Sequence, residues 1–240
     1  MPFQEDLKEL KNRILLILAA FAIAFIFFYT YSPQVMDFIV TKGNEAGYQF
    51  VYINPAEVLV QQIKIASIAS IIVIIPLIII QASLFIGPGI DSGFWGVMLP
   101  SIFACVMFIL GALFSYLVLV PFIFNSLYDV GINAKITAQV SIENYISLYL
   151  VLIVALGLIF ELPLVTLGLT KFGILDSNKM KTGRKIAIVI AFIIAALITP
   201  PDVFSQVVVA MPIIILYQFS IVLCKLVERK QKKCDLELQS

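Results

Sequence analysis

The sequence has no histidine, and only 13% of its 240 residues carry a charge. The missing histidine removes the commonest general base and the commonest metal ligand in proteins. The scarcity of charge leaves too little polar surface for a water-soluble globule, because 61% of the residues are hydrophobic. The composition therefore predicts a membrane protein and argues against an enzyme, and we expect no catalytic residue.

Cysteines and basic residues are too few or too scattered to form a familiar site. The three cysteines, Cys105, Cys224 and Cys234, lie at unrelated positions without the spacing of a metal site. The net charge is +1, and no basic stripe interleaved with aromatic residues is present. We therefore expect no metal, no cofactor and no nucleic-acid partner.

Six apolar stretches approach the length of about 20 residues that spans a bilayer core. They predict an all-α, polytopic membrane protein with six transmembrane helices in kinked, splayed packing, forming a single membrane domain over residues 1–240. The fifth and sixth helices are predicted to be short, and the 14 residues of the fifth cover only about 21 Å. The predicted spans are 14–31, 63–85, 97–120, 145–170, 186–199 and 206–224, followed by a cytoplasmic tail at 225–240.

Lysine and arginine are unevenly distributed between the spans. All but three of the 16 lie in the N-terminal segment, in the loop after the fourth span or in the C-terminal tail. Because cytoplasmic loops retain cations, this pattern predicts that both termini are cytoplasmic. The external segments, 32–62 and 121–144, are long enough to form cap-like structure of their own.

Three polar residues lie within or beside the spans, where a charge costs about 2.5–3.5 kcal/mol at a helix centre. Lys64 is one turn into the second span, and its stem could reach the outer interface. Glu161 lies mid-span ahead of Pro163, which predicts a buried functional or partner-binding role. Asp202 follows two prolines and is predicted to cap the sixth helix, which does not exclude a second role.

Prolines inside the predicted helices indicate a concave bundle. Pro76 and Pro212 each remove a backbone hydrogen bond and kink their helices, and Pro100, Pro121 and Pro163 add breaks. These positions predict a groove at membrane depth.

The N-terminal segment has an amphipathic pattern with Leu7, Leu10 and Ile14 on one helical face. Glu9 and Arg13 have the spacing of an i,i+4 ion pair. This pattern predicts a solvated interfacial helix that leads into the membrane.

Four segments, in order along the chain, resemble the TatC family, the multispanning receptor and core subunit of the twin-arginine protein translocase. Residues 6–13 are similar to the N-terminal motif of the family, with Glu9 at its acidic position. Residues 85–88 match the end of its second span, and 160–163 match its fourth-span glutamate. The most specific match is 199–206, which reads Thr-Pro-Pro-Asp-Val-Phe-Ser-Gln.

The resemblance has departures at the proposed recognition surface. Asp6 and Lys11 replace a histidine and an arginine of the N-terminal motif. Phe94 stands where the family usually has a glutamate, and Asp91 is the only nearby carboxylate. We expect Asp91 to act with Glu9 as the second of two carboxylates that dock a signal peptide.

The resemblance implies a receptor that binds twin-arginine signal peptides of folded precursor proteins and organises TatA-type and TatB-type single-span partners. It implies export driven by the proton-motive force, an oligomer in the lipid bilayer, and the bacterial cytoplasmic (inner) membrane, with plastid thylakoid or mitochondrial inner membrane as alternatives. The implied signal-peptide site comprises Glu9, Lys11, Phe85, Pro88, Asp91 and Phe94. The implied intramembrane polar contacts for partners are Glu161, Asp202 and Gln206.

The alternative function is a small proton-coupled secondary transporter that uses Glu161. We find no internal repeat between the two halves of the chain, and only one mid-membrane acid, whereas transporters of this kind usually have paired broken helices. An intramembrane hydrolase is disfavoured further, since histidine is absent and no second buried acid accompanies Glu161.

Overall fold

The fold is described from a computed structural model that covers residues 2–51, 53–86, 94–133, 139–171, 173–200 and 202–238. Within these ranges, side chains are described except at 2–7, 79, 82–86, 94–97, 130, 132–133 and 230–238. The chain divides into two compact units. The first comprises Met1–Val106 with Phe124–Val154, and the second comprises Met107–Ile123 with Ala155–Ser240.

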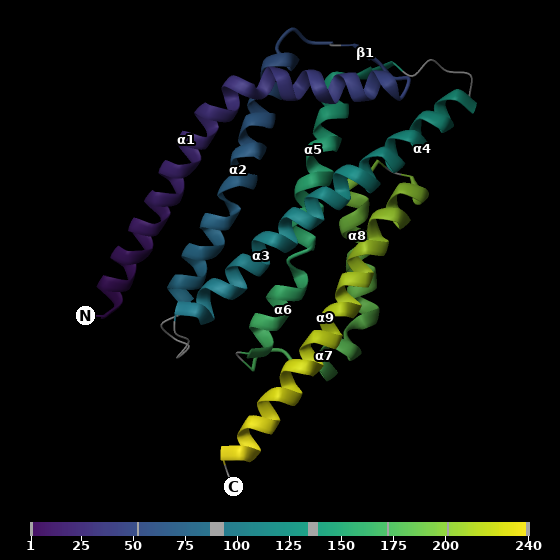
Figure 1. The fold of residues 1–240 in the computed structure, drawn as a ribbon. Coiled ribbons are helices and arrows are strands. Elements are labelled where there is room, and N and C mark those ends of the chain that lie inside the picture. Colours follow the sequence, from purple (N-terminus) through teal and green to yellow (C-terminus); the bar gives the residue numbers. More distant parts are fainter. Residues whose placement is uncertain are drawn as a thin grey trace. The chain divides into compact units, whose positions relative to one another are not determined.

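Helices account for most of the described residues (Figure 1). Their bounds are α1 Pro2–Glu45, α2 Glu57–Ile86, α3 Phe94–Phe114, α4 Val120–Asn133, α5 Ile142–Ile159, α6 Leu162–Lys171, α7 Ser177–Thr182, α8 Arg184–Ile198 and α9 Val203–Leu238. A π-helical turn at Ser115–Leu119 joins α3 to α4, just before Pro121, which has no N–H to donate. Two short strands, β1 Gln49–Val51 and β2 Gln139–Ser141, complete the described elements.

Five helical stretches of the described chain are long and apolar enough to cross a membrane. They are Lys8–Glu45, Glu57–Ile78, Met98–Asp129, Ile142–Lys171 and Val203–Arg229. The predicted fifth span corresponds to α8, whose 15 residues extend only about 22 Å. The all-α membrane fold and the shortness of this helix are therefore confirmed, while six spans with both termini inside stay predictions.

The prediction of a short sixth helix is wrong. Helix α9 has 36 residues and continues through the segment that we predicted as a tail. The apolar run ends near Cys224, but the sequence that follows contains lysine, glutamate and leucine, which are good helix formers, and no glycine or proline. Loss of hydrophobicity marked the end of the apolar span, but it did not mark the end of the helix.

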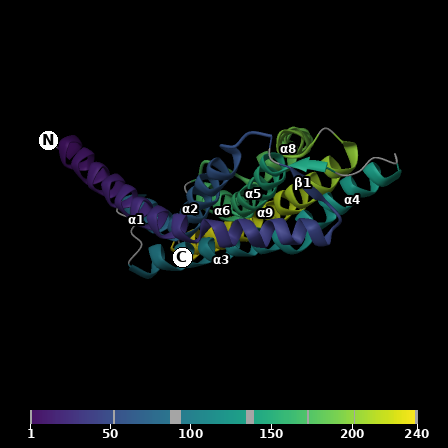
Figure 2. The same ribbon diagram turned by 90° about the horizontal axis from the view of Figure 1, so that it is seen from above.

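Helix α1 extends beyond its predicted span and bends near Pro33, as both ribbon views show (Figures 1 and 2). Pro33 cannot donate to the carbonyl of Tyr29, four residues earlier. The hydroxyl of Ser32 donates to that carbonyl instead, at 2.9 Å. The helix therefore changes direction without leaving this buried acceptor unpaired, and it continues to Glu45 within the predicted external segment.

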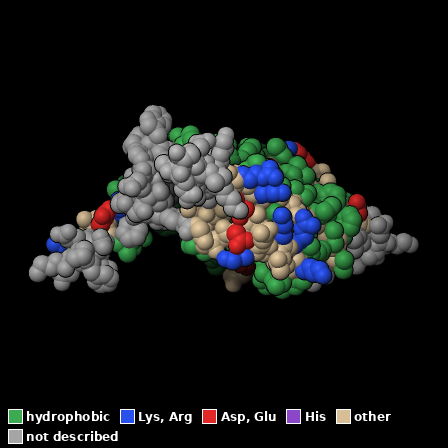
Figure 3. Space-filling model, turned by 90° about the horizontal axis from the view of Figure 1, so that it is seen from below, with side chains coloured by type: hydrophobic (Ala, Val, Ile, Leu, Met, Phe, Trp, Pro, Cys, Tyr) green, Lys and Arg blue, Asp and Glu red, His purple; other side chains and the backbone are tan. Residues whose placement is uncertain are grey.

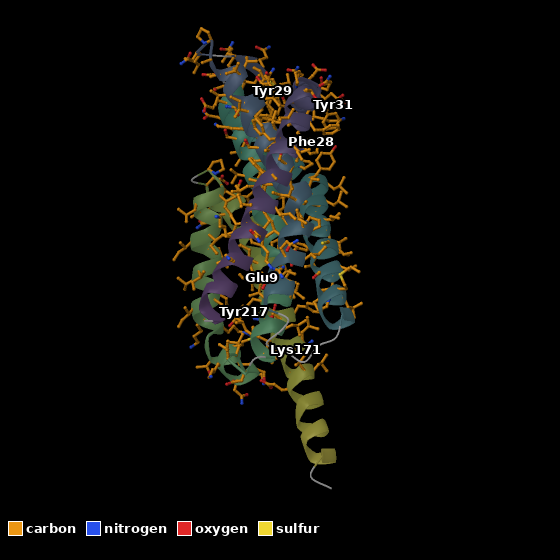
Figure 4. All side chains as sticks on the ribbon, turned by 90° about the vertical axis from the view of Figure 1, so that its left-hand side faces the viewer. Glu9, Phe28, Tyr29, Tyr31, Lys171 and Tyr217 are labelled. Carbon is orange, nitrogen blue, oxygen red and sulfur yellow. The ribbon has the colours of Figure 1, made fainter. Side chains whose placement is uncertain are left out.

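Aromatic residues mark one end of the membrane-spanning part of α1. Figure 4 shows Phe28, Tyr29 and Tyr31 near the bend, and Glu9 toward the opposite end of the same helix. The 20 residues between Glu9 and Tyr29 correspond to about 30 Å of helix, the thickness of a bilayer core. Aromatic side chains are enriched at membrane interfaces, so this spacing predicts that the bend and Glu9 lie near opposite interfaces.

The two segments that we predicted to be external pair with each other in the first unit, so they have structure of their own, while their external location stays a prediction. Strands β1 and β2 are parallel, with Phe50 opposite Val140. Aromatic rings pack beside them, and the hydroxyl of Tyr48 donates to the carbonyl of Phe124 at 2.6 Å. Burial, with smaller effects of nearby charged groups, raises the pKa of Tyr48 to about 12. The phenol therefore stays neutral and keeps this hydrogen bond.

Close helix contacts organise the second unit. Helices α6, α7 and α8 pack against α9. Gly111 and Gly157 lie where the end of α3 meets the end of α5, and Gly157 lies against the buried ring of Phe108. Small residues allow helix backbones to approach closely where lipid supplies no hydrophobic driving force. This contact positions the turn that follows α5, which contains Glu161.

Candidate functional sites

A hydrogen-bonded group at the N-terminal end of α1 contains the predicted carboxylate Glu9. The guanidinium of Arg13 donates to Oε1 of Glu9 through Nε at 3.0 Å and through Nη2 at 2.5 Å. The same guanidinium donates through Nη1 to the side-chain oxygen of Gln81 on α2 at 2.8 Å and to its backbone carbonyl at 3.2 Å. The predicted Glu9–Arg13 pair is present, and it is attached to α2.

This geometry leaves one oxygen of Glu9 available. Both bonds from Arg13 converge on Oε1, and no described residue donates to Oε2. The side chain of Glu9 is 52% exposed, whereas that of Arg13 is 19% exposed. Arg13 therefore orients the carboxylate through Oε1 and leaves Oε2 without a donor among the described residues. A carboxylate held in this way can accept a further N–H donor from a cation.

The other predicted signal-peptide residues are only partly covered by the structure. Lys11 is exposed on α1, two residues after Glu9. Pro88 and Asp91 lie outside the described residues. Phe85 is in the last turn of α2 and Phe94 begins α3, but their side chains lie outside the described part. Their grouping with Glu9 in one site stays a prediction.

Glu161 occupies the break between α5 and α6 in the second unit. Its backbone carbonyl accepts from Leu164 and Val165, both at 3.0 Å, and Pro163 has no N–H to continue the helix. The carboxylate oxygen Oε1 is buried and has no hydrogen-bond partner among the described residues. A buried acceptor without a partner is costly, and the partner-binding role of Glu161 stays a prediction.

Asp202 and Gln206 lie together at the start of α9. Asp202 caps the helix as predicted, since its Oδ2 accepts from the backbone N–H of Ser205 at 2.7 Å. Its other oxygen, Oδ1, is buried without a partner among the described residues. The amide of Gln206 donates to the carbonyl of Phe192 on α8 at 3.0 Å. No described hydrogen bond or ion pair joins either residue to Glu161.

Sequence reasoning missed two polar partners in the first unit. Lys64 donates to Glu143, in the first turn of α5, at 3.0 Å and to Ser147 at 3.1 Å. We expected the stem of Lys64 to extend to the outer interface. The structure shows that its ammonium group also forms an ion pair with Glu143. Gln81, which binds Arg13, was missed as well. The one signal for each was a polar residue in an otherwise apolar stretch, and sequence alone does not say which distant residue it meets.

These features define a class: a multispanning α-helical membrane protein with carboxylates held at one end of its first helix and within its helix breaks. Residues 5–212 match the family model of the Sec-independent protein translocase protein TatC. The chain belongs to the TatC family. The family is one of protein translocases, so the role of this chain lies in protein transport.

Individual relatives match along nearly the whole chain. The TatC protein of Helicobacter pylori strain J99 is 36% identical over 233 residues, covering 95% of this chain and 92% of that protein. That of Aquifex aeolicus strain VF5 is 35% identical over 239 residues, covering 97% and 98%. A crystal structure of the twin-arginine translocase receptor TatC superposes with a TM-score of 0.83 at 32% identity, over 92% of this chain and 98% of that chain.

Proposed function

We propose that this chain is the receptor and core subunit of a twin-arginine translocase, and that Glu9 is a docking group for the paired arginines of a signal peptide. The observation that carries this proposal is the half-exposed carboxylate of Glu9, oriented by Arg13 through Oε1 with Oε2 unoccupied by any described residue. The similarity to a solved twin-arginine translocase receptor supports it.

The chemistry of the carboxylate suits arginine better than lysine. A guanidinium is planar and presents parallel N–H donors, so it can bind a carboxylate with defined geometry. The ammonium group of lysine is a compact, strongly hydrated charge and satisfies the same site less well. Asp91 is proposed as the second carboxylate, with Lys11, Phe85, Pro88 and Phe94 around the bound peptide.

The second unit is proposed to bind single-span partners of the TatA and TatB type. Glu161 and Asp202 each have a buried oxygen without a partner among the described residues, and such groups gain from a polar side chain of another helix in lipid. Gln206 belongs to the same proposed surface, although its amide N–H already binds α8. The chain would act as an oligomer in the bacterial inner membrane.

The remaining proposals concern the membrane and the energy source. The chain would form one membrane domain of six spans with both termini in the cytoplasm. The 15-residue helix α8 would thin the bilayer where folded cargo passes. The transmembrane potential, worth about 2.3 kcal/mol per charge per 100 mV, would drive export.

Site-specific photocrosslinking tests the receptor function. A photoreactive residue is placed at position 8, 92 or 94, which leaves the carboxylates of Glu9 and Asp91 intact, and a signal peptide with two arginines or with two lysines is added. We expect crosslinks from 8 and 92 that fade with the lysine peptide, because lysine lacks the planar fork. The absence of an arginine-dependent crosslink at all three positions would contradict the receptor site and favour the proton-coupled transporter.

Glu161→Gln is expected to weaken association with single-span partners several-fold, because it replaces a carboxyl group whose buried oxygen has no partner among the described residues. Signal-peptide crosslinking at position 8, beside the intact Glu9, should stay unchanged. Co-purification of partners with the tagged chain measures the effect, and Glu143→Gln, which removes a carboxylate already paired with Lys64, is the control. Partner recovery equal to that of the original chain would return Glu161 to a purely structural role.

A further inference from the structure

A basic cavity lies between α7, α8 and α9 in the second unit, away from the groups considered above. It has a volume of about 530 Å³ and is lined by Lys181, Arg184, Gln218, Ile221, Val222 and Lys225. Its lining contains three cations and no acid. The loop and the helix end that form it belong to the cation-rich side of the chain, which the distribution of lysine and arginine assigns to the cytoplasm.

The cations of this cavity are available to an anion. Within the described part of the chain, Lys181, Arg184 and Lys225 take part in no ion pair. Arg184 donates one N–H to the side-chain oxygen of Gln218, which holds the guanidinium in place at the cavity wall. Its remaining donors are free to bind a planar or tetrahedral oxyanion.

Nearby carboxylates are already engaged by other groups. Asp176 caps α7 by accepting from the backbone N–H of Lys179 at 2.7 Å, and this bond lowers its pKa. Glu228 accepts from the backbone N–H of Ser177 at 2.5 Å and from its hydroxyl at 2.6 Å. Neither side chain lines the cavity, so its positive charge is not neutralised from within the described residues.

An exposed apolar stripe on α9 leads away from the cavity toward the centre of the span. Val222 lines the cavity and is 55% exposed, and Phe219 and Ile215 follow on the same helical face with 50% and 62% exposure. All three lie within the apolar span Val203–Arg229. The cavity is therefore at the depth where lipid headgroups meet the hydrocarbon core, with a surface for acyl chains beside it.

We propose that this cavity binds the phosphate headgroup of an anionic phospholipid, with its acyl chains along the stripe formed by Ile215, Phe219 and Val222. Basic pockets on the cytoplasmic side of transmembrane helices suit such headgroups, and each nearby cation strengthens the attraction. The face drawn in Figure 3 shows Lys and Arg side chains beside hydrophobic ones, the combination that an amphipathic lipid requires. A soluble phosphate would use the cations alone.

The test measures lipid binding to the purified full chain by native mass spectrometry in detergent, with phosphatidylglycerol or phosphatidylcholine added. The test variant combines Lys181→Gln, Arg184→Gln and Lys225→Gln. The matched control combines Lys171→Gln, Lys179→Gln and Lys185→Gln, which removes the same charge from the same side outside the cavity. We expect phosphatidylglycerol affinity to fall at least about tenfold in the test variant and to change less than about twofold in the control.

Three outcomes would overturn the proposal. Unchanged phosphatidylglycerol binding in the test variant would remove the cavity as the site. An equal loss in both variants would indicate diffuse charge attraction. If inorganic phosphate displaced bound phosphatidylglycerol as effectively as added phosphatidylglycerol does, the cavity would be a site for a free anion. If the triple variant does not fold, Arg184→Gln alone replaces it. We then expect phosphatidylglycerol affinity to fall about fivefold, and the same three outcomes would overturn the proposal.

Discussion

Replacing Gly111 by alanine is expected to destabilise the protein by about 3 kcal/mol, a large effect for the addition of one methyl group. A Cβ at this position would lie 2.6 Å from the backbone oxygen of Leu156 and 2.8 Å from the Cβ of Phe160. The backbone oxygen cannot turn aside as a flexible side chain can, so α3 and α5 must separate. That movement would also displace Glu161, which follows Phe160 directly.

A matched substitution is available in the same unit. Gly168 lies within α6, and a Cβ there would meet nothing within 4 Å. Gly168→Ala is therefore expected to be neutral or stabilising by up to about 1 kcal/mol, because alanine favours helix more than glycine does. Thermal unfolding in detergent, followed by circular dichroism, compares the two. Equal melting temperatures for the two variants would mean that the helices do not meet as closely as described.

Glu9→Gln is expected to reduce export of a twin-arginine substrate by about tenfold or more, because a hydrogen bond between charged groups contributes about 1.5–3 kcal/mol. The substitution keeps the size of the side chain and an oxygen for Arg13, so α1 should remain helical. The exposed Glu9–Arg13 pair itself contributes less than about 1 kcal/mol to stability. The loss would therefore reflect recognition rather than unfolding.

The control for this prediction lies on the same helix. Glu45 pairs with Lys42 at 2.7 Å near the far end of α1, and Glu45→Gln removes a carboxylate of similar exposure. Export of a reporter protein carrying a twin-arginine signal is measured for both variants, together with the amount of each variant in the membrane. Equal export by Glu9→Gln and Glu45→Gln would mean that the carboxylate of Glu9 is not a docking group.

Several features followed from the sequence because they depend on short-range chemistry. The cap at Asp202 and the pair of Glu9 with Arg13 each join residues within one helical turn, so spacing alone predicts them. The apolar stretches were found because about 20 residues must be hydrophobic to span a bilayer. The predicted ends of α1 and α9 were too early, since a helix can continue in water beyond the lipid that required its apolar residues.

Other features needed the folded chain. The bond from Arg13 to Gln81 and that from Lys64 to Glu143 join residues far apart in sequence. The pairing of β1 with β2 is a contact of the same kind. In an apolar sequence, many polar residues could meet in principle, and only the packing of the helices selects one pair. The basic cavity likewise combines α7, α8 and α9, and no single segment predicts it.

The sequence by itself determined that this protein lies in a membrane, that it is a multispanning helical protein, and which carboxylates are candidates for a functional role. It could do so because hydrophobicity, charge and local spacing are properties of the chain. The tertiary structure alone decided which oxygen of Glu9 receives the bonds from Arg13, which buried carboxylate oxygens have no partner among the described residues, and where cations gather around a cavity. These depend on distances between helices, which are set by side-chain packing and by close contacts such as that at Gly111.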